Sequence, residues 1–444
     1  MGPAHSRHPA LMNPAASDAL YLGIDIGTSG CRAMAIDEGG ALHGDARVPL
    51  PEPTREGACV AQDPALWWDA LAALLDTLFR DIPAGRIRSL AVDGTSSTLL
   101  LTDKLGTALS PALMYNDARA VAEAERIARI APRETAAHGP SCGLAKLLWM
   151  QRTYPGEHVA HALHQADWIS GRLCGRFGIS DSNNCLKLGY DPVSRQWPGW
   201  LGQTGAYKDW LPRVVEPGSV LGPVTREIAT RFGFSSHTQV VAGTTDSTAA
   251  FIATGAHEPG EAVTSLGSTL VMKVISQRPI FAPEYGIYSQ PLGDLWLAGG
   301  GSNSGGAVLR QFFSNEQLRE LSQRIDPARS SGLDYYPLPA PGERFPVCDP
   351  HLAPRLTPRP ADDAAFLHGL FEGMARIEQM AYQRLAELGA PYPSSIRSAG
   401  GGAQNPAWRT IRARLLEAPL IEATQQEAAY GSALLARRPF TGEQ

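Results

Sequence analysis

The chain of 444 residues has only six cysteines, and none of them forms a C-x-x-C pair. Sparse, unpaired cysteines exclude a disulfide-rich scaffold and argue against a zinc site, so we expect reduced thiols in a cytosolic protein. His158, His161 and His164 recur at a three-residue spacing, but no cysteine or acidic ligand pattern accompanies them. This spacing favours a solvated helix face over a metal site.

The sequence also lacks a run of lysine or arginine and a long apolar segment. Its formal net charge of −5 argues against nucleic acid or an anionic membrane as the main partner. No apolar run approaches the roughly 18–20 residues that a membrane helix needs. Residues 1–18 lack the apolar core of a signal peptide, and although M-G-P-A-H-S formally fits the myristoylation pattern, Pro3 is a poor neighbour for the reactive glycine. We therefore expect residues 1–19 to be a disordered tail and the location to be cytoplasmic.

An internal repeat dominates what the sequence does contain. D-I-G-T-S at 25–29 and S-L-G-S-T at 265–269 each join two apolar runs through a glycine and two hydroxyl residues, 240 residues apart (265 − 25). Each segment predicts a β-hairpin that opens a half of mixed strands and helices. The chain is also longer than one hydrophobic core usually serves. We therefore predict an α/β fold of two lobes, residues 20–255 and 256–440, that face one nucleotide-binding cleft.

Segments outside the two hairpins mix strands, glycine turns and helices. Residues 87–103 predict two strands around the break G-T-S-S, and residues 67–79 have helical apolar spacing. Residues 166–178 predict a short helix closed by glycine, and the proline-rich residues 325–362 predict extended loops. A strand, a glycine loop and a helix follow one another at 239–256, 295–313 and 396–423.

The first hairpin could cradle a phosphate group. Gly27 and Gly30 let backbone amides approach an anion, and Thr28 and Ser29 add hydroxyl donors. Asp25, at the end of the first strand, could hold a hydrated Mg²⁺, which takes few carboxylates. Ordinary turn chemistry would explain the same residues. The second copy, with Gly267, Ser268 and Thr269, favours the phosphate interpretation.

Asp246, in V-V-A-G-T-T-D-S, follows an apolar strand and opens a predicted helix. An aspartate at this place is often only the helix N-cap. At a strand end in a cleft between two lobes, it could instead act as the general base that accepts a hydroxyl proton during attack on a γ-phosphate.

Two glycine loops, at 298–306 and 399–409, connect strands to helices. The first places Asn303 and Ser304 near a helix start, and the second has Pro406 at a predicted N1 position with Asn405 as its N-cap. Helix N-termini bind phosphate and ribose oxygens, so both loops indicate nucleotide binding. Neither loop matches the P-loop pattern or a dinucleotide-binding βαβ unit.

Four hydroxyl residues, Thr95 to Thr98, follow a strand in D-G-T-S-S-T-L-L-L. They are consistent with a kinked strand end or with hydrogen bonds to a polyol. Trp197, Trp200 and Trp210 fit loop anchors better than a sugar platform.

Taken in order, G-I-D-I-G-T-S, V-D-G-T-S-S, N-D-A-R, A-G-T-T-D-S, S-L-G-S-T and A-G-G-G-A-Q-N-P-A-W resemble the FGGY carbohydrate kinases over roughly residues 20–436. The resemblance implies the two-lobed, ribonuclease-H-like fold shared with hexokinase and actin. It also implies transfer of the γ-phosphate of ATP to a sugar hydroxyl, with Mg²⁺ as cofactor.

Within that family, D-G-T-S-S-T-L-L-L and residues 166–192 resemble the compact D-ribulose kinases of plants and cyanobacteria. D-xylulose kinases usually carry a Met-His pair where this chain has Ser96–Thr98. The resemblance therefore implies a ketopentose kinase that converts D-ribulose to D-ribulose 5-phosphate. A D-xylulose or sugar-alcohol kinase, or an ATPase switch without sugar acceptor, remains the alternative. The sequence leaves the oligomeric state open, a homodimer included.

The resemblance also implies roles for individual residues. Asp25 matches the family aspartate near Mg²⁺ and substrate, and Asp246 matches the catalytic base, which also contacts the substrate. Thr28 matches a γ-phosphate contact and Ser96 a sugar-binding position. The remaining matches are Gly267 and Thr269 in the second phosphate hairpin, Gly401, Gly402, Asn405 and Trp408 in the adenosine loop, and Asn116, Asp117 and Arg119 near the substrate.

Overall fold

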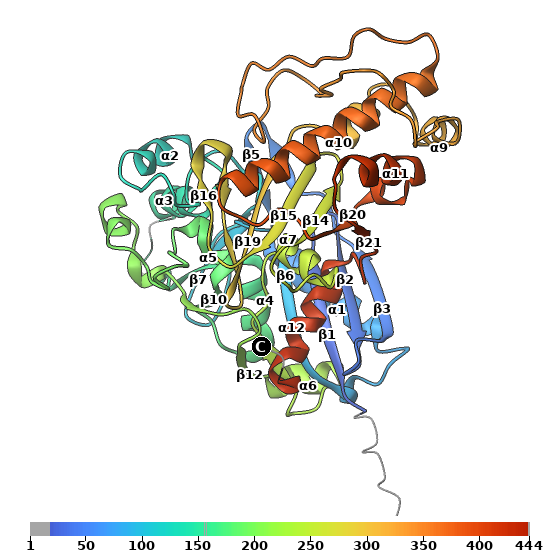
Figure 1. Ribbon diagram of the computed structural model, residues 1–444. Coiled ribbons are helices and arrows are strands. Elements are labelled where there is room, and N and C mark those ends of the chain that lie inside the picture. The colour runs from blue at the N-terminus through green and yellow to red at the C-terminus, as the bar shows by residue number, and fades with distance from the viewer. Residues whose placement is uncertain (1–17, 155, 157, 443–444) are drawn as a thin grey trace, which may run out of the picture.

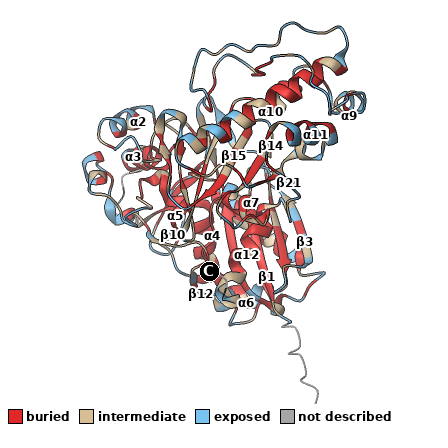
Figure 2. Cartoon of the chain, viewed as in Figure 1, coloured by how far each residue is buried: buried red, intermediate tan, exposed pale blue. Residues whose placement is uncertain are grey.

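The computed structural model describes residues 18–154, 156 and 158–442. Almost all of the predicted tail, residues 1–17, lies outside the described residues. Two six-stranded sheets form the centre of the molecule, one in each half of the chain, and helices cover their faces (Figure 1). Figure 2 shows that the central strands of both sheets are buried between these layers, whereas edge strands are partly exposed.

The first sheet is built on the predicted hairpin at residues 21–37, which the structure confirms. β1 (Leu20–Ile26) pairs antiparallel with β2 (Gly30–Ile36) and parallel with β6 (Ile87–Gly94). Along the sheet the order is β12 (Val220–Pro223), β13 (Gln239–Val241), β6, β1, β2 and β3 (Leu42–Pro49). Every residue of β1 is buried, as expected for a strand covered on both faces.

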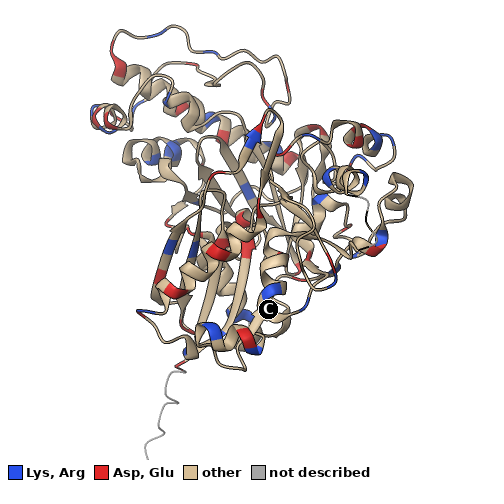
Figure 3. Cartoon of the chain, turned by 180° about the vertical axis from the view of Figure 1, so that it is seen from behind, with Lys and Arg blue, Asp and Glu red and all other residues tan. Residues whose placement is uncertain are grey.

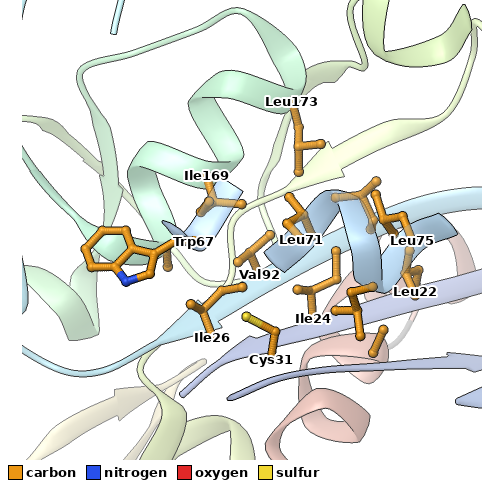
Figure 4. Packing of buried hydrophobic residues seen from close by; sticks show 14 of the residues in the cluster. Leu22, Ile24, Ile26, Cys31, Trp67, Leu71, Leu75, Val92, Ile169 and Leu173 are labelled. Atoms are coloured by element: carbon orange, nitrogen blue, oxygen red, sulfur yellow. The ribbon is translucent and has the colours of Figure 1, made fainter. Parts of the chain in front are cut away.

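Two helices cover one face of the first sheet: α1 (Pro64–Leu78), which matches the predicted helix at 67–79, and α4 (Gln165–Cys174). Leu22, Ile24 and Ile26 of β1 pack there against Leu71 of α1 and Ile169 of α4, as Figure 4 shows. α4 ends at Gly175 in the left-handed conformation, so the predicted glycine stop is confirmed.

The second sheet repeats this plan. β14 (Glu261–Leu266) pairs antiparallel with β15 (Leu270–Ser276) and parallel with β20 (Ser395–Ala399). The sheet order is β18 (Gln290–Leu292), β19 (Leu295–Ser302), β15, β14, β20 and β21 (Leu420–Ile421). Its helices are α8 (Gly306–Leu309), α9 (Asn315–Gln323), α10 (Asp363–Glu387) and α11 (Pro406–Leu415).

A small third sheet lies beside the first one. Its order is β4 (Thr54–Glu56), β5 (Cys59–Gln62), β8 (Ala112–Leu113), β7 (Leu99–Thr102) and β9 (His161–His164), packed with α2 (Val121–Ala128) and α3 (Gly143–Thr153). The two strands predicted within residues 87–103 exist as β6 and β7, but they belong to different sheets. The turn between them, residues 95–98, therefore joins the first sheet to the third.

Two helices lie against the other face of the first sheet. α7 (Asp246–Ala253) and α12 (Ala428–Thr441) share a hydrophobic cluster with Tyr21, Ile36 and Val241. α12 is the last helix of the chain, yet it packs against strands from the first half. The remaining elements are β10 (Ile179–Asp181), α5 (Ser182–Cys185), β11 (Arg213–Val215), α6 (Arg226–Phe232), β16 (Phe281–Ala282) and β17 (Ile287–Tyr288).

The loop prediction for residues 325–362 is confirmed, because these residues, all of them described, contain neither helix nor strand. In the described part of the chain, no helix is long and apolar enough to cross a membrane. Figure 3 shows Lys and Arg interspersed with Asp and Glu over both halves of the chain.

Candidate active site

Two carboxyl groups lie side by side where β1 and β6 end. The parallel register places Asp25 of β1 opposite Asp93 of β6, and both side chains are buried. Nη1 of Arg32 donates a hydrogen bond to Oδ2 of Asp25 at 3.1 Å. Oγ of Ser432, on α12, donates to Oδ2 of Asp93 at 2.5 Å. The C-terminal helix thus completes a polar cluster on the first sheet.

The surroundings of the two carboxyl groups favour their protonated forms. Burial raises the pKa of both, and the negative charge of Asp25 adds to the rise for Asp93, whose pKa lies well above its usual value. The charge of Arg32 lowers the pKa of Asp25, and the hydrogen bond from Ser432 lowers that of Asp93. The pKa of Asp93 is therefore raised further than that of Asp25, and Arg32 supports the ionised form of Asp25.

Asp246 is the first residue of α7, so the strand and helix predicted at 239–256 are confirmed. The N-cap is Thr245 rather than Asp246, whose Oδ1 accepts a hydrogen bond from N of Ser247 at 2.6 Å. Burial raises the pKa of Asp246 to about 6, and the charge of Asp25 contributes, which shows that the two carboxylates face one site. A carboxylate with a pKa near neutrality is a suitable general base.

The second sheet reaches the start of α7 through a lysine. Nζ of Lys273, on β15, donates to the carbonyl oxygen and to Oγ of Ser247, both at 3.1 Å. The charges of Lys273 and Lys187 lower the Asp246 pKa, and burial lowers the pKa of Lys273 to about 8. Asp246 consequently lies where residues from both halves of the chain meet.

A cavity of about 690 Å³ opens beside the second hairpin, within the second half of the chain. Among the predicted nucleotide residues, Gly267, Gly401, Gly402, Asn405 and Trp408 all line it. Further lining residues are Ser268, Gly306, Arg310, Asn315 and Phe371. The volume and this mixed apolar and polar lining suit a ligand of nucleoside size.

The glycine loops lie directly against the second hairpin. N of Gly306 donates to the carbonyl oxygen of Gly267 at 2.9 Å, and Gly305 has a φ of 144°. A Cβ atom at Gly305 would lie 2.8 Å from the carbonyl oxygen of Ser268, so only glycine fits there. Asn303, by contrast, is held by Glu343 and Gly342 and does not line the cavity.

Asn405 and Trp408 shape the floor of this cavity. Oδ1 of Asn405 accepts from N of Trp408 at 3.0 Å, and Pro406 opens α11, so the predicted N-cap and N1 residues are confirmed. The Trp408 ring is buried and stacks on Phe371 with 5.1 Å between ring centroids. No described residue hydrogen-bonds with its Nε1 atom.

The other predicted residues lie away from the cavity. Thr28 and Thr269 are half-buried in the turns of the two hairpins, and Ser96 is half-buried in the turn between β6 and β7. Asp117 has a structural contact, because its Oδ2 accepts from N of Val60 at 2.5 Å, and it also pairs with Arg119. No described residue hydrogen-bonds with the buried Oδ1 of Asn116.

Three residues of the polar cluster are absent from the sequence prediction: Asp93, Arg32 and Ser432. Asp93 had a detectable signal, since it ends an apolar strand just before a hydroxyl turn, as Asp25 does. No sequence pattern pointed to Ser432, because only the packing of α12 brings this residue beside Asp93.

The histidine prediction is wrong. His161 and His164 lie at the ends of β9, not on a helix face, and His164 is fully buried with its Nδ1 3.1 Å from Oδ2 of Asp167. The described residues contain no group of three or more His, Cys, Asp or Glu side chains that could hold a metal ion.

The chain resembles known proteins over nearly its whole length. It is 28% identical to the xylulose kinase of Streptomyces coelicolor over 457 residues, which cover 97% of this chain and 90% of that protein. The match to the xylulose kinase of Escherichia coli is 26% identical over 277 residues and covers 61% of this chain and 57% of that protein. A crystal structure described as a xyloylose kinase from Brucella ovis superposes with a TM-score of 0.86 at 25% identity, covering 96% of this chain and 91% of that one.

Sequence profiles of the FGGY family of carbohydrate kinases match both halves. The N-terminal domain profile matches residues 20–253, and the C-terminal domain profile matches residues 262–438. The predicted two-lobed α/β fold of the actin and hexokinase type is thereby confirmed. The chain belongs to the FGGY family of carbohydrate kinases.

Proposed function

We propose that the protein transfers the γ-phosphate of ATP to the terminal hydroxyl of a ketopentose, with D-ribulose as the acceptor. The observation that carries the proposal is the position of Asp246, at the start of α7 between the two sheets and within the field of Asp25. With a pKa of about 6, its carboxylate is ionised at neutral pH and can take the proton of an attacking hydroxyl.

ATP would bind with its adenosine in the cavity at Gly402 and Trp408 and its phosphates toward the second hairpin. The turn amides of both hairpins and the hydroxyl groups of Thr28 and Thr269 would then donate to the phosphate oxygens.

The residues at the end of β1 fit a Mg²⁺ ion. Asp25 supplies a buried carboxyl group beside Arg32, and no described residue hydrogen-bonds with the buried Oδ1 of its neighbour Asp93. Bound at Asp25, Mg²⁺ would neutralise negative charge on the phosphate oxygens, as it does with few carboxylates and several waters elsewhere. Arg32 holds Asp25 in place on the protein side.

Two sugars compete as acceptor, each supported by a different observation. Ser96 stands in the turn where xylulose kinases usually carry a Met-His pair, which favours D-ribulose. The relatives reported above are named xylulose kinases, which favours D-xylulose. Both acceptors require the same base and the same phosphate residues.

The test is ADP release from MgATP, measured with D-ribulose, D-xylulose, L-ribulose, ribitol, glycerol and no sugar. We expect a large rise with D-ribulose that Asp246→Asn abolishes and the exposed control Glu258→Gln preserves. A rise with D-xylulose alone would show that D-xylulose is the acceptor and would leave the proposed phosphate transfer unchanged. Equal release in every reaction would contradict a sugar kinase and favour an ATPase switch.

A further inference from the structure

A lysine with no access to solvent lies under the turn that contains Ser96, the proposed sugar-binding residue. Lys146, on α3, is fully buried, which is rare for a lysine without a carboxylate partner. Its Nζ donates to the carbonyl oxygen of Ser97 at 2.8 Å and to that of Met114 at 2.6 Å. Burying an ammonium group is costly, so two charge-assisted hydrogen bonds to fixed carbonyls are its main compensation.

The two carbonyl groups belong to two different turns. Ser97 lies in the turn at 95–98, between β6 and β7. Met114 follows β8 and begins the turn at 114–117, in which N of Asp117 donates to the Met114 carbonyl oxygen at 2.9 Å. Lys146 therefore connects two segments that are distant in sequence, and each carries hydroxyl or amide groups suited to a polyol.

The turn at 95–98 is strained at the residue that Lys146 holds. Ser97 has a φ of 66°, a left-handed conformation that side chains other than glycine rarely adopt. Such strain persists only where the surrounding structure imposes it, and it gathers at ligand sites. Its Oγ atom is buried, and no described residue hydrogen-bonds with it.

The second turn carries a matching group. Oδ1 of Asn116 is buried, and again no described residue hydrogen-bonds with it. Ser96 is half-buried beside Ser97. Unpaired buried polar atoms are costly unless a ligand satisfies them, and these lie in the two turns that Lys146 connects.

We propose that Lys146 is a positioning residue for the sugar. It holds the turn at 95–98 against the turn at 114–117, and so fixes Ser96, Ser97 and Asn116 at the spacing that a polyhydroxylated acceptor needs. This inference rests on the proposed sugar-kinase function and adds the residue that sets acceptor affinity.

The charge state of Lys146 agrees with such a role. Burial lowers its pKa to about 7, while Asp117 raises it and the positive charges of Lys187 and Arg119 lower it. The ammonium and neutral amine forms are thus both present at neutral pH. In either form, the hydrogen bonds to the two carbonyl groups compensate for the burial of the nitrogen atom.

The test compares Lys146→Met with the exposed control Lys104→Met. Methionine keeps the volume of the side chain but removes the donors. We expect the KM for the sugar to rise about tenfold or more, the change that losing one or two charge-assisted hydrogen bonds causes, with the KM for ATP and kcat changed less than about twofold. Equal changes for sugar and ATP, or no change, would overturn the inference.

A double variant separates positioning from general stability. Glycine adopts a positive φ without strain, so Ser97→Gly relieves the requirement for Lys146. We expect Lys146→Met to raise the sugar KM less in the Ser97→Gly background than in the wild type. Strictly multiplicative effects would contradict positioning. If Lys146→Met does not fold, Lys146→Gln can be used, because its amide group still donates hydrogen bonds. We expect it to raise the sugar KM selectively, but by less.

Failure of the proposed function would be visible in the wild type alone. The changes in KM and kcat are measured with the sugar that the wild type uses best. If the wild type uses none, acceptor binding is read from the rise in melting temperature that D-ribulose, D-xylulose or ribitol causes. A smaller rise in Lys146→Met than in Lys104→Met would support the inference, and an equal rise would overturn it.

Discussion

The two hairpins, β1–β2 and β14–β15, occupy the same place in the two sheets but carry different side chains at their strand ends. In the first, Asp25 faces Arg32 across the hairpin and Asp93 on the neighbouring parallel strand. In the second, Ser265 faces Val271 across the hairpin and Ala399 on the neighbouring strand. The same strand pairing around each hairpin therefore supports a charged end in one half and an uncharged end in the other.

The first hairpin has charged side chains at its strand end, whereas the second hairpin has a cavity beside it. The cavity of about 690 Å³ lies against the second hairpin and is lined by glycines and the Trp408 ring. The comparison shows that two halves with the same hairpin can differ in function through a few side chains at equivalent strand ends. In the proposed reaction, the first half handles the proton and the metal, and the second half handles the nucleotide.

The largest expected effect concerns the base. Asp246→Asn keeps the shape of the side chain and removes its ability to accept a proton, so kcat should fall by about 10²–10⁴-fold. Steady-state ADP release with the preferred sugar measures this, with Glu258→Gln as the control. Wild-type turnover in Asp246→Asn would mean that the base lies elsewhere.

The paired carboxyls should respond unequally. Asp25 is the carboxyl group proposed to hold Mg²⁺, so Asp25→Asn should lower kcat by about 10²-fold and weaken the dependence on Mg²⁺. The pKa of Asp93 is raised well above its usual value, and the amide oxygen of an asparagine can still accept from Ser432. Asp93→Asn should therefore cost less than about tenfold.

Mg²⁺ titrations of both variants measure this difference. The reverse order, with Asp93→Asn as the more damaging change, would move the metal-binding role from Asp25 to Asp93.

The nucleotide side can be altered separately. A Cβ atom at Gly402 would lie 2.5 Å from Cζ3 of Trp408, so Gly402→Ala should displace the ring and raise the KM for ATP about tenfold. The sugar KM should stay the same. Gly85→Ala is the matched control, because a Cβ atom there meets its nearest neighbour only at 3.9 Å. An unchanged KM for ATP would remove adenosine from this cavity.

At neutral pH the smallest effect comes from the titration of Asp246. The pKa of Asp246 is raised to about 6 and its ionised form is the active one, so kcat/KM should rise with pH, reach half its plateau near pH 6, and fall about tenfold per unit below that. A profile of log kcat/KM between pH 4.5 and 8.5 measures it. A half-point near pH 4 would show that the pKa of Asp246 is not raised in the free enzyme.

Local patterns predicted most of the elements near the site. Both hairpins, the strand and helix around Asp246, and the cap at Asn405 follow from glycine turns and apolar alternation, which act over a few residues. The sequence pattern did not predict α10. Its Gly369 and Gly373 weaken helix propensity, and they are there because the helix packs closely on Tyr335.

The sequence by itself determined the repeat, the two hairpins and the family motifs, because each depends on residues close together in the chain. Only the tertiary structure decided which distant groups meet. It placed Asp93 beside Asp25, brought Ser432 from the last helix to the first sheet, and set Lys146 under two turns of different segments. The physical reason is that strand register and helix packing are fixed by the burial of whole faces, which no short stretch of sequence contains.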